Sequence, residues 1–236
     1  MVPARRIAAT LAAALLTAAL TACEPVDLSI PPGTGPAANP AANAHEPPGT
    51  VDAPTARTRL AALIEAPPAT LDGYVRDCDN GDACVFGQPW FDTDGDGCDQ
   101  RSQVLARDMV DVIRKPGRCA VTSGTLHDPY TGQTVTSVSK IQIDHVVPLA
   151  EMWRSGAANW PPDQRTRAAN DLTNLLAVNG KTNQSKGDKT PDVWLPPNTA
   201  YHCTYARIYI TTKSNYALTV TAIERQALAQ ALAACG

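Results

Sequence analysis

The sequence predicts a single α+β domain that is rich in helix, contains a small antiparallel hairpin and is stabilised by disulfides. Three observations predict this class. Apolar residues at helical spacing occur near both ends of the segment 57–236, a stretch rich in Val, Thr and Ile lies between them, and the segment holds six cysteines. Its roughly 180 residues are enough for one domain with a hydrophobic core.

Residues 1–22 are predicted to be an export signal. Arg5 and Arg6 precede an apolar run that is too short and too rich in alanine to span a membrane stably. The run ends in Leu-Thr-Ala-Cys, which resembles the lipobox of bacterial lipoproteins. That resemblance implies cleavage before Cys23, a diacylglyceryl group on its sulfur, and attachment to the outer face of the cytoplasmic membrane. The alternative is an ordinary secretory signal with an incidental cysteine, and both interpretations predict an exported protein.

Residues 23–56 are predicted to be a tether. Eight prolines fall within 24–54, and the first aromatic residue of the whole chain is Tyr74. Such a stretch cannot bury enough apolar surface to offset the entropy lost on ordering, so we expect it to be extended and mobile.

The cysteines of the domain are predicted to form three disulfides, because six is an even number and the chain is exported. They are Cys78, Cys84, Cys98, Cys119, Cys203 and Cys235. The sequence does not select one pairing among the many that six cysteines allow. Zinc binding is a weaker alternative, since no C-x-x-C pair occurs.

Helices are predicted where apolar residues recur at helical spacing and where capping or terminating residues bound them. The predicted helices span 55–66, 101–115, 161–171, 199–218 and 221–235. Pro116 and Gly117 end the second helix, and two prolines precede the first turn of the third. Thr221 and Glu224 form a capping-box pattern at the start of the last.

A β section is predicted for residues 119–147, which are rich in Val, Thr and Ile. The tetrapeptide Pro-Tyr-Thr-Gly at 129–132 is expected to form a hairpin turn within it. A further short strand is expected at 172–178, where the sequence reads LTNLLAV.

An acidic loop at 92–99 is a candidate calcium site. Its segment DTDGDG matches the start of calcium-binding loops, with Asp92, Asp94 and Asp96 as ligands. Gln103 stands at the twelfth position, where such loops carry a bidentate Glu. The chain has a net charge of only −3, yet residues 72–100 hold eight acidic residues and one basic residue. That local charge favours a structural Ca²⁺, and a solvated turn is the alternative.

Asp144 and His145 stand together at the end of the apolar run IQIDHVV. Phosphodiester hydrolysis needs a base that activates water near neutral pH, which suits an imidazole. It also needs a hard cation, which prefers carboxylate and amide oxygens as ligands. Adjacent strand residues point to opposite faces, so one can hold a metal while its neighbour reaches the nucleophile. Asn174 and Asn183 supply amide groups downstream.

The ordered motifs DHVVPL, NLLAV and NQSKGDKTPDVW resemble the HNH group of ββα-metal (His-Me finger) nucleases, and most closely exported bacterial proteins of that group. The resemblance is clear over 141–194 and extends over 72–203. It implies a ββα-metal core at about 134–194 within a nuclease domain at 57–236, followed by C-terminal helices at 199–236. Its site would comprise Asp144 as first metal ligand, His145 as general base, Asn174 as the residue that ties the finger together and orients the histidine, and Asn183 as last metal ligand.

One position departs from the usual HNH pattern, because Asn183 stands where the family usually has a histidine. The segment between His145 and Asn174 is long for this finger and is expected to hold a helix. Asn170 and Asn179 are therefore alternative candidates for the two asparagine roles.

The sequence thus predicts an exported, monomeric endonuclease that uses Mg²⁺ or Mn²⁺ to hydrolyse DNA, with RNA left open as a substrate. Lys186 and Lys189, beside Asn183, are candidate phosphate contacts. The alternative is a noncatalytic, calcium-binding surface lipoprotein that captures nucleic acid, which would have no use for a base beside a metal ligand. A metallopeptidase is disfavoured because no H-E-x-x-H motif occurs.

Overall fold

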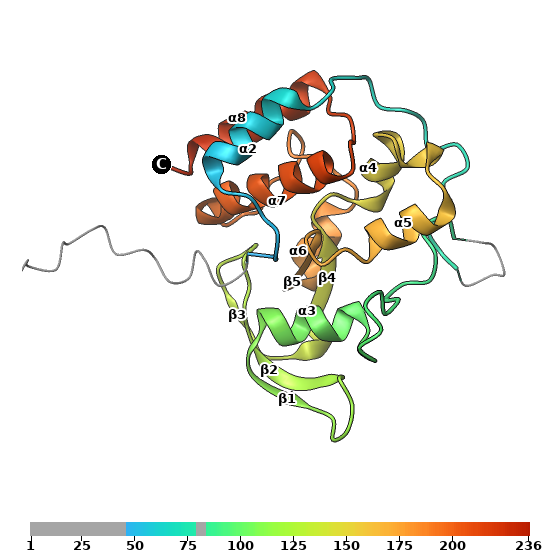
Figure 1. Ribbon diagram of the computed structural model, residues 1–236. Coiled ribbons are helices and arrows are strands. Elements are labelled where there is room, and N and C mark those ends of the chain that lie inside the picture. The colour runs from blue at the N-terminus through green and yellow to red at the C-terminus, as the bar shows by residue number, and fades with distance from the viewer. Residues whose placement is uncertain (1–45, 79–83) are drawn as a thin grey trace, which may run out of the picture. The chain divides into compact units, whose positions relative to one another are not determined.

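The computed structural model describes residues 46–78 and 84–236 (Figure 1). The predicted export signal, Cys23 and most of the predicted tether lie outside the described residues. Within the described part of the chain, no helix is both long enough and apolar enough to cross a membrane.

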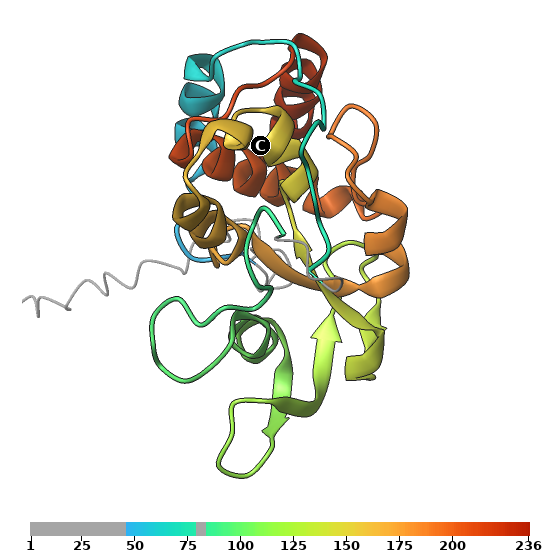
Figure 2. The same ribbon diagram turned by 90° about the vertical axis from the view of Figure 1, so that its right-hand side faces the viewer.

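A two-stranded antiparallel ribbon, β4 (Ile141–His145) and β5 (Leu175–Asn179), lies between two layers of the domain (Figures 1 and 2). Alternate side chains of β5 enter different apolar clusters. Leu176 packs into the cluster on the side of the helices, and Leu175 packs into the cluster on the side of the other sheet. Burial on both faces explains why β5 is a continuous apolar run rather than an alternating one.

One layer is helical, and in it α2 (Ala53–Ala62) and α8 (Ala222–Ala233) pack directly against α7 (His202–Asn215). The other members are α4 (Leu149–Arg154) and α5 (Pro162–Ala169), with short 3₁₀ turns at Ala157–Asn159 and Thr199–Tyr201. Tyr205, Ile208 and Tyr209 of α7 have no exposed surface. The predicted capping box at the start of α8 is confirmed, because the Thr221 and Glu224 side chains each bond the other residue's backbone N–H.

The opposite layer consists of α3 (Gln100–Asp108) and a three-stranded antiparallel sheet. Its strands, in spatial order, are β1 (Val110–Arg114), β2 (Val121–His127) and β3 (Thr134–Val135), followed by a 3₁₀ turn at Val138–Lys140. The predicted hairpin turn at 129–132 is confirmed, since it joins β2 to β3.

The predicted helix at 101–115 is wrong in its second half, where the chain forms strand β1. Val110, Val112 and Ile113 are β-branched and favour strand, and they find a partner in β2. A bulge accommodates the pairing: Asp111 adopts a positive φ of 53° there. The helical spacing of apolar residues did continue past residue 109, but tertiary pairing overrode it.

The outer edge of β5 is closed by charged side chains instead of a third strand. The Ala177 N–H donates to Asp108 at 2.8 Å, and the Asn179 N–H donates to Asp128 at 2.9 Å. The guanidinium of Arg107 donates to the Leu175 carbonyl at 2.6 Å. Backbone groups that a neighbouring strand would otherwise bond are therefore already satisfied.

The domain begins before the predicted boundary between residues 56 and 57. Glu46 pairs with Arg207 of α7 at 2.8 Å, and the Val51 carbonyl accepts a hydrogen bond from the same guanidinium. Helix α2 starts at Ala53, with Asp52 as its N-cap. Residues 46–56, predicted to belong to the tether, are thus held against α7 because polar groups in this proline-rich stretch find fixed partners there.

All six cysteines of the domain are paired, as the sequence predicts. The disulfides are Cys78–Cys84, Cys98–Cys119 and Cys203–Cys235. The last joins the first turn of α7 to the residue just beyond α8, and the second fixes the acidic loop to the chain that enters β2. The chain is therefore a mixed α/β domain with disulfides.

Candidate active site

The candidate site lies where β4 packs against α6 (Gly180–Lys186). The turn from β5 into α6 is tight: a Cβ on Gly180 would lie 3.1 Å from the Lys140 carbonyl oxygen, so glycine fits there best. Asn179 caps the helix, since its side-chain oxygen accepts from the N–H groups of Lys181 and Thr182. This turn brings α6 back over the strand that carries Asp144.

Two side chains of α6, Asn183 and Lys186, contact two side chains of β4, Gln142 and Asp144. The Lys186 ammonium donates to both carboxylate oxygens of Asp144 at 2.8 Å, and Asn183 Nδ2 donates to Gln142 Oε1 at 3.0 Å. The Tyr130 hydroxyl also donates to Asp144. Burial raises the pKa of Asp144 and lowers the pKa of Lys186, while their mutual attraction opposes both shifts.

His145 is oriented by the inserted helix α5. Its Nε2 lies 2.7 Å from the Ala169 carbonyl oxygen, which can only accept, so Nε2 carries the proton and Nδ1 of the neutral ring is the free acceptor. Burial, aided by the positive charge of Arg76, lowers the pKa of His145 to about 3. The imidazole is therefore neutral at neutral pH, and its Nδ1 keeps a free lone pair.

Asn174 holds the chain that follows His145. Its side-chain oxygen accepts from the Val147 N–H at 2.8 Å, and its side-chain nitrogen donates to the Val147 carbonyl at 3.0 Å. Its own carbonyl accepts from the Val146 N–H at 2.9 Å. The side chain is fully buried. Asn174, which immediately precedes β5, thus fastens the two residues that follow His145.

Asp144, His145 and Asn183 line one cavity of about 450 Å³. Arg76 and Asp188 line it as well, and sequence reasoning assigned neither of them to the site. One feature of the sequence could have pointed to Arg76. It is the single basic residue within 72–100, a segment that holds eight acidic residues.

The residues of the cavity fit a hard dication. Asp144 Oδ1 accepts one hydrogen bond, so one of its two accepting positions is left. Asn183 Oδ1 accepts none from the described residues, because its amide contact with Gln142 uses the nitrogen. A carboxylate and an amide oxygen that line one cavity are the kind of ligand set that Mg²⁺ takes.

The remaining predicted residues lie elsewhere. Lys186 was predicted to contact phosphates, and this is wrong: its side chain is fully buried on Asp144, out of reach of a substrate. Lys189 is exposed and donates to the Ser185 carbonyl. Of the alternative asparagines, Asn179 caps α6, and Asn170 bonds the Phe91 N–H and the Thr166 carbonyl. Neither lines the cavity.

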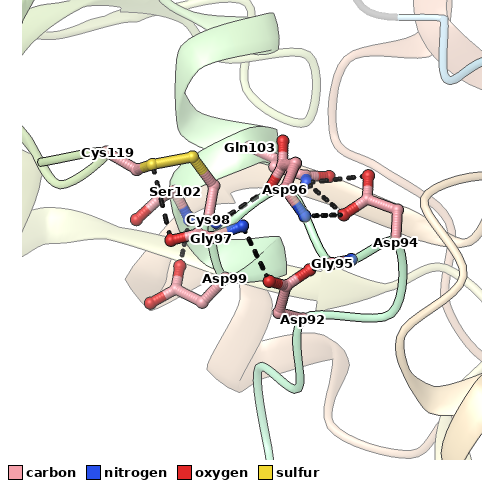
Figure 3. The surroundings of a disulfide bond; sticks show 10 residues. All are labelled: Asp92, Asp94, Gly95, Asp96, Gly97, Cys98, Asp99, Ser102, Gln103 and Cys119. Atoms are coloured by element: carbon pink, nitrogen blue, oxygen red, sulfur yellow. Dashed lines mark hydrogen bonds between the residues drawn. A yellow bond between two sulfur atoms is a disulfide. The ribbon is translucent and has the colours of Figure 1, made fainter.

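The acidic loop forms a separate carboxylate cluster (Figure 3). One oxygen from each of Asp92, Asp94 and Asp96 lies within 4.8 Å of the others, and no other group of three potential metal-binding residues occurs in the described segments. Both oxygens of Asp92 accept backbone N–H groups, from Gly95 and Gly97. Gln103 reaches back from α3 and donates to Asp94.

Residues 99–231 match the family model of the C-terminal domain of GmrSD restriction endonucleases. The chain belongs to this family. The matched GmrSD C-terminal segment begins at the N-cap of α3 and contains Asp144, His145, Asn174 and Asn183, whereas Arg76 and α2 precede it.

A fungal relative from Arthroderma benhamiae, described as an uncharacterized secreted protein, is 44% identical over 191 residues. That match covers 80% of this chain and 89% of the relative. The similarity therefore extends beyond the GmrSD C-terminal segment. No solved structure matches the chain.

Proposed function

We propose that this protein is an exported, metal-dependent endonuclease that hydrolyses phosphodiester bonds of DNA. The observation that carries the proposal is the cavity shared by His145 and by the oxygens of Asp144 and Asn183. A neutral base and oxygen ligands for a hard cation are the groups that phosphodiester hydrolysis needs. Membership of the GmrSD family supports nuclease-type activity, and the secreted relative supports an extracellular location.

His145 is the general base in this proposal, and its Nδ1 takes the proton from the attacking water. The Ala169 carbonyl fixes its tautomer, and Asn174 fixes the backbone beside it. Asp144 and Asn183 would hold Mg²⁺ or Mn²⁺. When bound, this ion would stabilise negative charge on the phosphate and on the leaving oxygen. The strand–strand–helix order of β4, β5 and α6 supports an HNH finger.

Positive charge at the cavity is supplied by Arg76, in place of the predicted Lys186. Its guanidinium is exposed, lines the cavity and makes no hydrogen bond or ion pair with another described residue. Arg76 is therefore the group we assign to the substrate phosphate, with exposed Lys189 as an outer, sequence-independent contact.

Cleavage of plasmid DNA tests the function. The purified mature protein should nick and linearise plasmid with Mg²⁺ or Mn²⁺, leave 5′-phosphate and 3′-hydroxyl ends, and stop when a chelator removes the metal. Single-stranded DNA and RNA in the same assay establish the substrate range. Absence of cleavage with either ion, or cleavage that the chelator leaves unchanged, would contradict the proposal. A noncatalytic surface protein that captures nucleic acid would bind these substrates without cutting them.

The loop around Asp92, Asp94 and Asp96 supports a structural calcium site, because three carboxylates this close repel one another unless a cation neutralises them. Calcium should raise the melting temperature, since it would bind the folded state preferentially. Asp94→Ala should abolish that rise, whereas Asp77→Ala, at an exposed carboxylate outside the loop, should keep it. If calcium leaves the melting curve of the wild type unchanged, the loop is a solvated turn.

Attachment through lipid at Cys23 remains a prediction of the sequence. The expected mature protein begins at Cys23, carries a diacylglyceryl group and partitions with membranes, as a monomer. Mass spectrometry of the mature N-terminus checks this. An unmodified terminus within 18–30, together with protein free in the medium, would instead support an ordinary secretory signal.

A further inference from the structure

Lys186 and Asp144 form a buried ion pair in which every N–H group of the ammonium is used. The ammonium has three N–H groups: it donates to both oxygens of Asp144 at 2.8 Å and to the His145 carbonyl at 2.7 Å. Lys186 has no exposed surface, and Asp144 is 4% exposed. The carboxylate at the centre of the site therefore already has a positive partner that water does not screen.

The second carboxylate at the cavity also has a positive partner. Asp188 accepts from Arg154 at 3.0 Å, and Arg154 also bonds Glu151 at 3.2 Å. Arg76 adds a positive charge that forms no ion pair with another described residue. The cavity thus offers oxygen ligands, and both of the carboxylates that line it are already ion-paired. A dication entering alone would meet the repulsion of Lys186 and Arg76, whereas a dication entering with a phosphodiester would meet the negative charge that the substrate brings.

We propose that Lys186 makes metal binding at this site conditional on substrate: its charge keeps the affinity for Mg²⁺ or Mn²⁺ low until a phosphate is present. The ammonium also holds Asp144 and the His145 carbonyl in place without metal, so the site is already folded when both arrive. This inference rests on the proposed function, because it assumes that Asp144 is a metal ligand. Lys186 is a positioning residue, since it contacts Asp144, the proposed metal ligand, and does not contact the substrate.

The direct test is a calorimetric titration with Mn²⁺ without nucleic acid, made in the Asp94→Ala background so that the acidic loop does not contribute. Lys186→Gln should bind Mn²⁺ roughly 10- to 100-fold more tightly than the parent, within the range usual for coupling between sites. Lys181→Gln is the matched control, because it removes the same charge from an exposed position of the same helix, and its Mn²⁺ affinity should be unchanged. Equal or weaker binding by Lys186→Gln would overturn the proposal.

The second test adds an uncleaved phosphorothioate DNA oligonucleotide. It should raise the Mn²⁺ affinity of the parent strongly and that of Lys186→Gln much less, because the variant no longer needs the negative charge of the phosphate. By linkage, Mn²⁺ should raise oligonucleotide affinity by the same factor in each protein. Identical enhancement in both proteins would show that Lys186 does not couple the two ligands.

Folding is followed by thermal melting, with Lys186→Met as a second variant. A variant that melts early without Mn²⁺ and recovers with it supports the proposal, since the metal then replaces the ammonium beside Asp144. If both variants stay unfolded with and without Mn²⁺, Lys186 is purely structural and the proposal is wrong. Plasmid cleavage by the wild type separates the two ideas: absent cleavage rejects the endonuclease, while unchanged Mn²⁺ affinity rejects only the role of Lys186.

Discussion

His145→Ala is expected to fold as the wild type does and to cleave nucleic acid about 10²–10⁴-fold more slowly, the usual loss when a general base is removed. No other histidine of the described residues lines the cavity, so no second imidazole is in place to activate the water. Single-turnover cleavage of plasmid measures the rate, and thermal melting checks the fold.

His202→Ala is the matched control for this prediction. The His202 ring also bonds a backbone carbonyl, that of Pro196, but it does not line the cavity. Its cleavage rate should remain close to that of the wild type. A wild-type rate for His145→Ala would show that another group activates the water. Equal losses in the two variants would point to a general effect on folding.

Lys213→Met is expected to cost about 3–5 kcal/mol of the free energy of unfolding, as when one partner of a buried ion pair is removed. The buried Lys213 ammonium joins α7 to two other helices: it lies 2.8 Å from Glu151 of α4 and 2.8 Å from Glu224 of α8. Without it, two buried carboxylates would share one site. For a domain of this size the melting temperature should fall by roughly 6–20 °C.

Lys140→Met is the comparison for Lys213→Met, because Lys140 is an exposed lysine and its loss should change stability little. Denaturant unfolding of both variants measures the difference. A loss below about 1 kcal/mol for Lys213→Met would mean that the carboxylates take up protons and that the charge network contributes little.

Local patterns in the sequence were enough to locate most elements near the site. The run LLAV predicted β5, the prolines before residue 163 predicted α5, and the Thr221 capping box fixed the start of α8. These signals succeed because they depend on residues close in sequence. The presence of disulfides followed likewise from the even count of cysteines, whereas their partners depend on the tertiary fold.

Features that depend on distant contacts could not be predicted in this way. Lys186 lies in a polar helix and looks like a solvent-facing residue, and only the packing of α6 on β4 shows that it is buried against Asp144. Arg76 reaches the cavity from a loop more than sixty residues before His145. Strand β1 has the apolar spacing of a helix, and its pairing with β2 decides its conformation.

The charged side chains along β5 have a consequence for behaviour at high protein concentration. A short, strongly apolar ribbon with open edges can recruit a strand from another molecule and start intermolecular sheet growth. Here the outer edge of β5 bonds to the side chains of Asp108, Asp128 and Arg107. On the outer edge of β4, two carbonyls accept hydrogen bonds from Lys186 and Arg101. A foreign strand would have to displace these ionised groups to bond the backbone positions that they occupy, which opposes growth of a longer sheet from this ribbon.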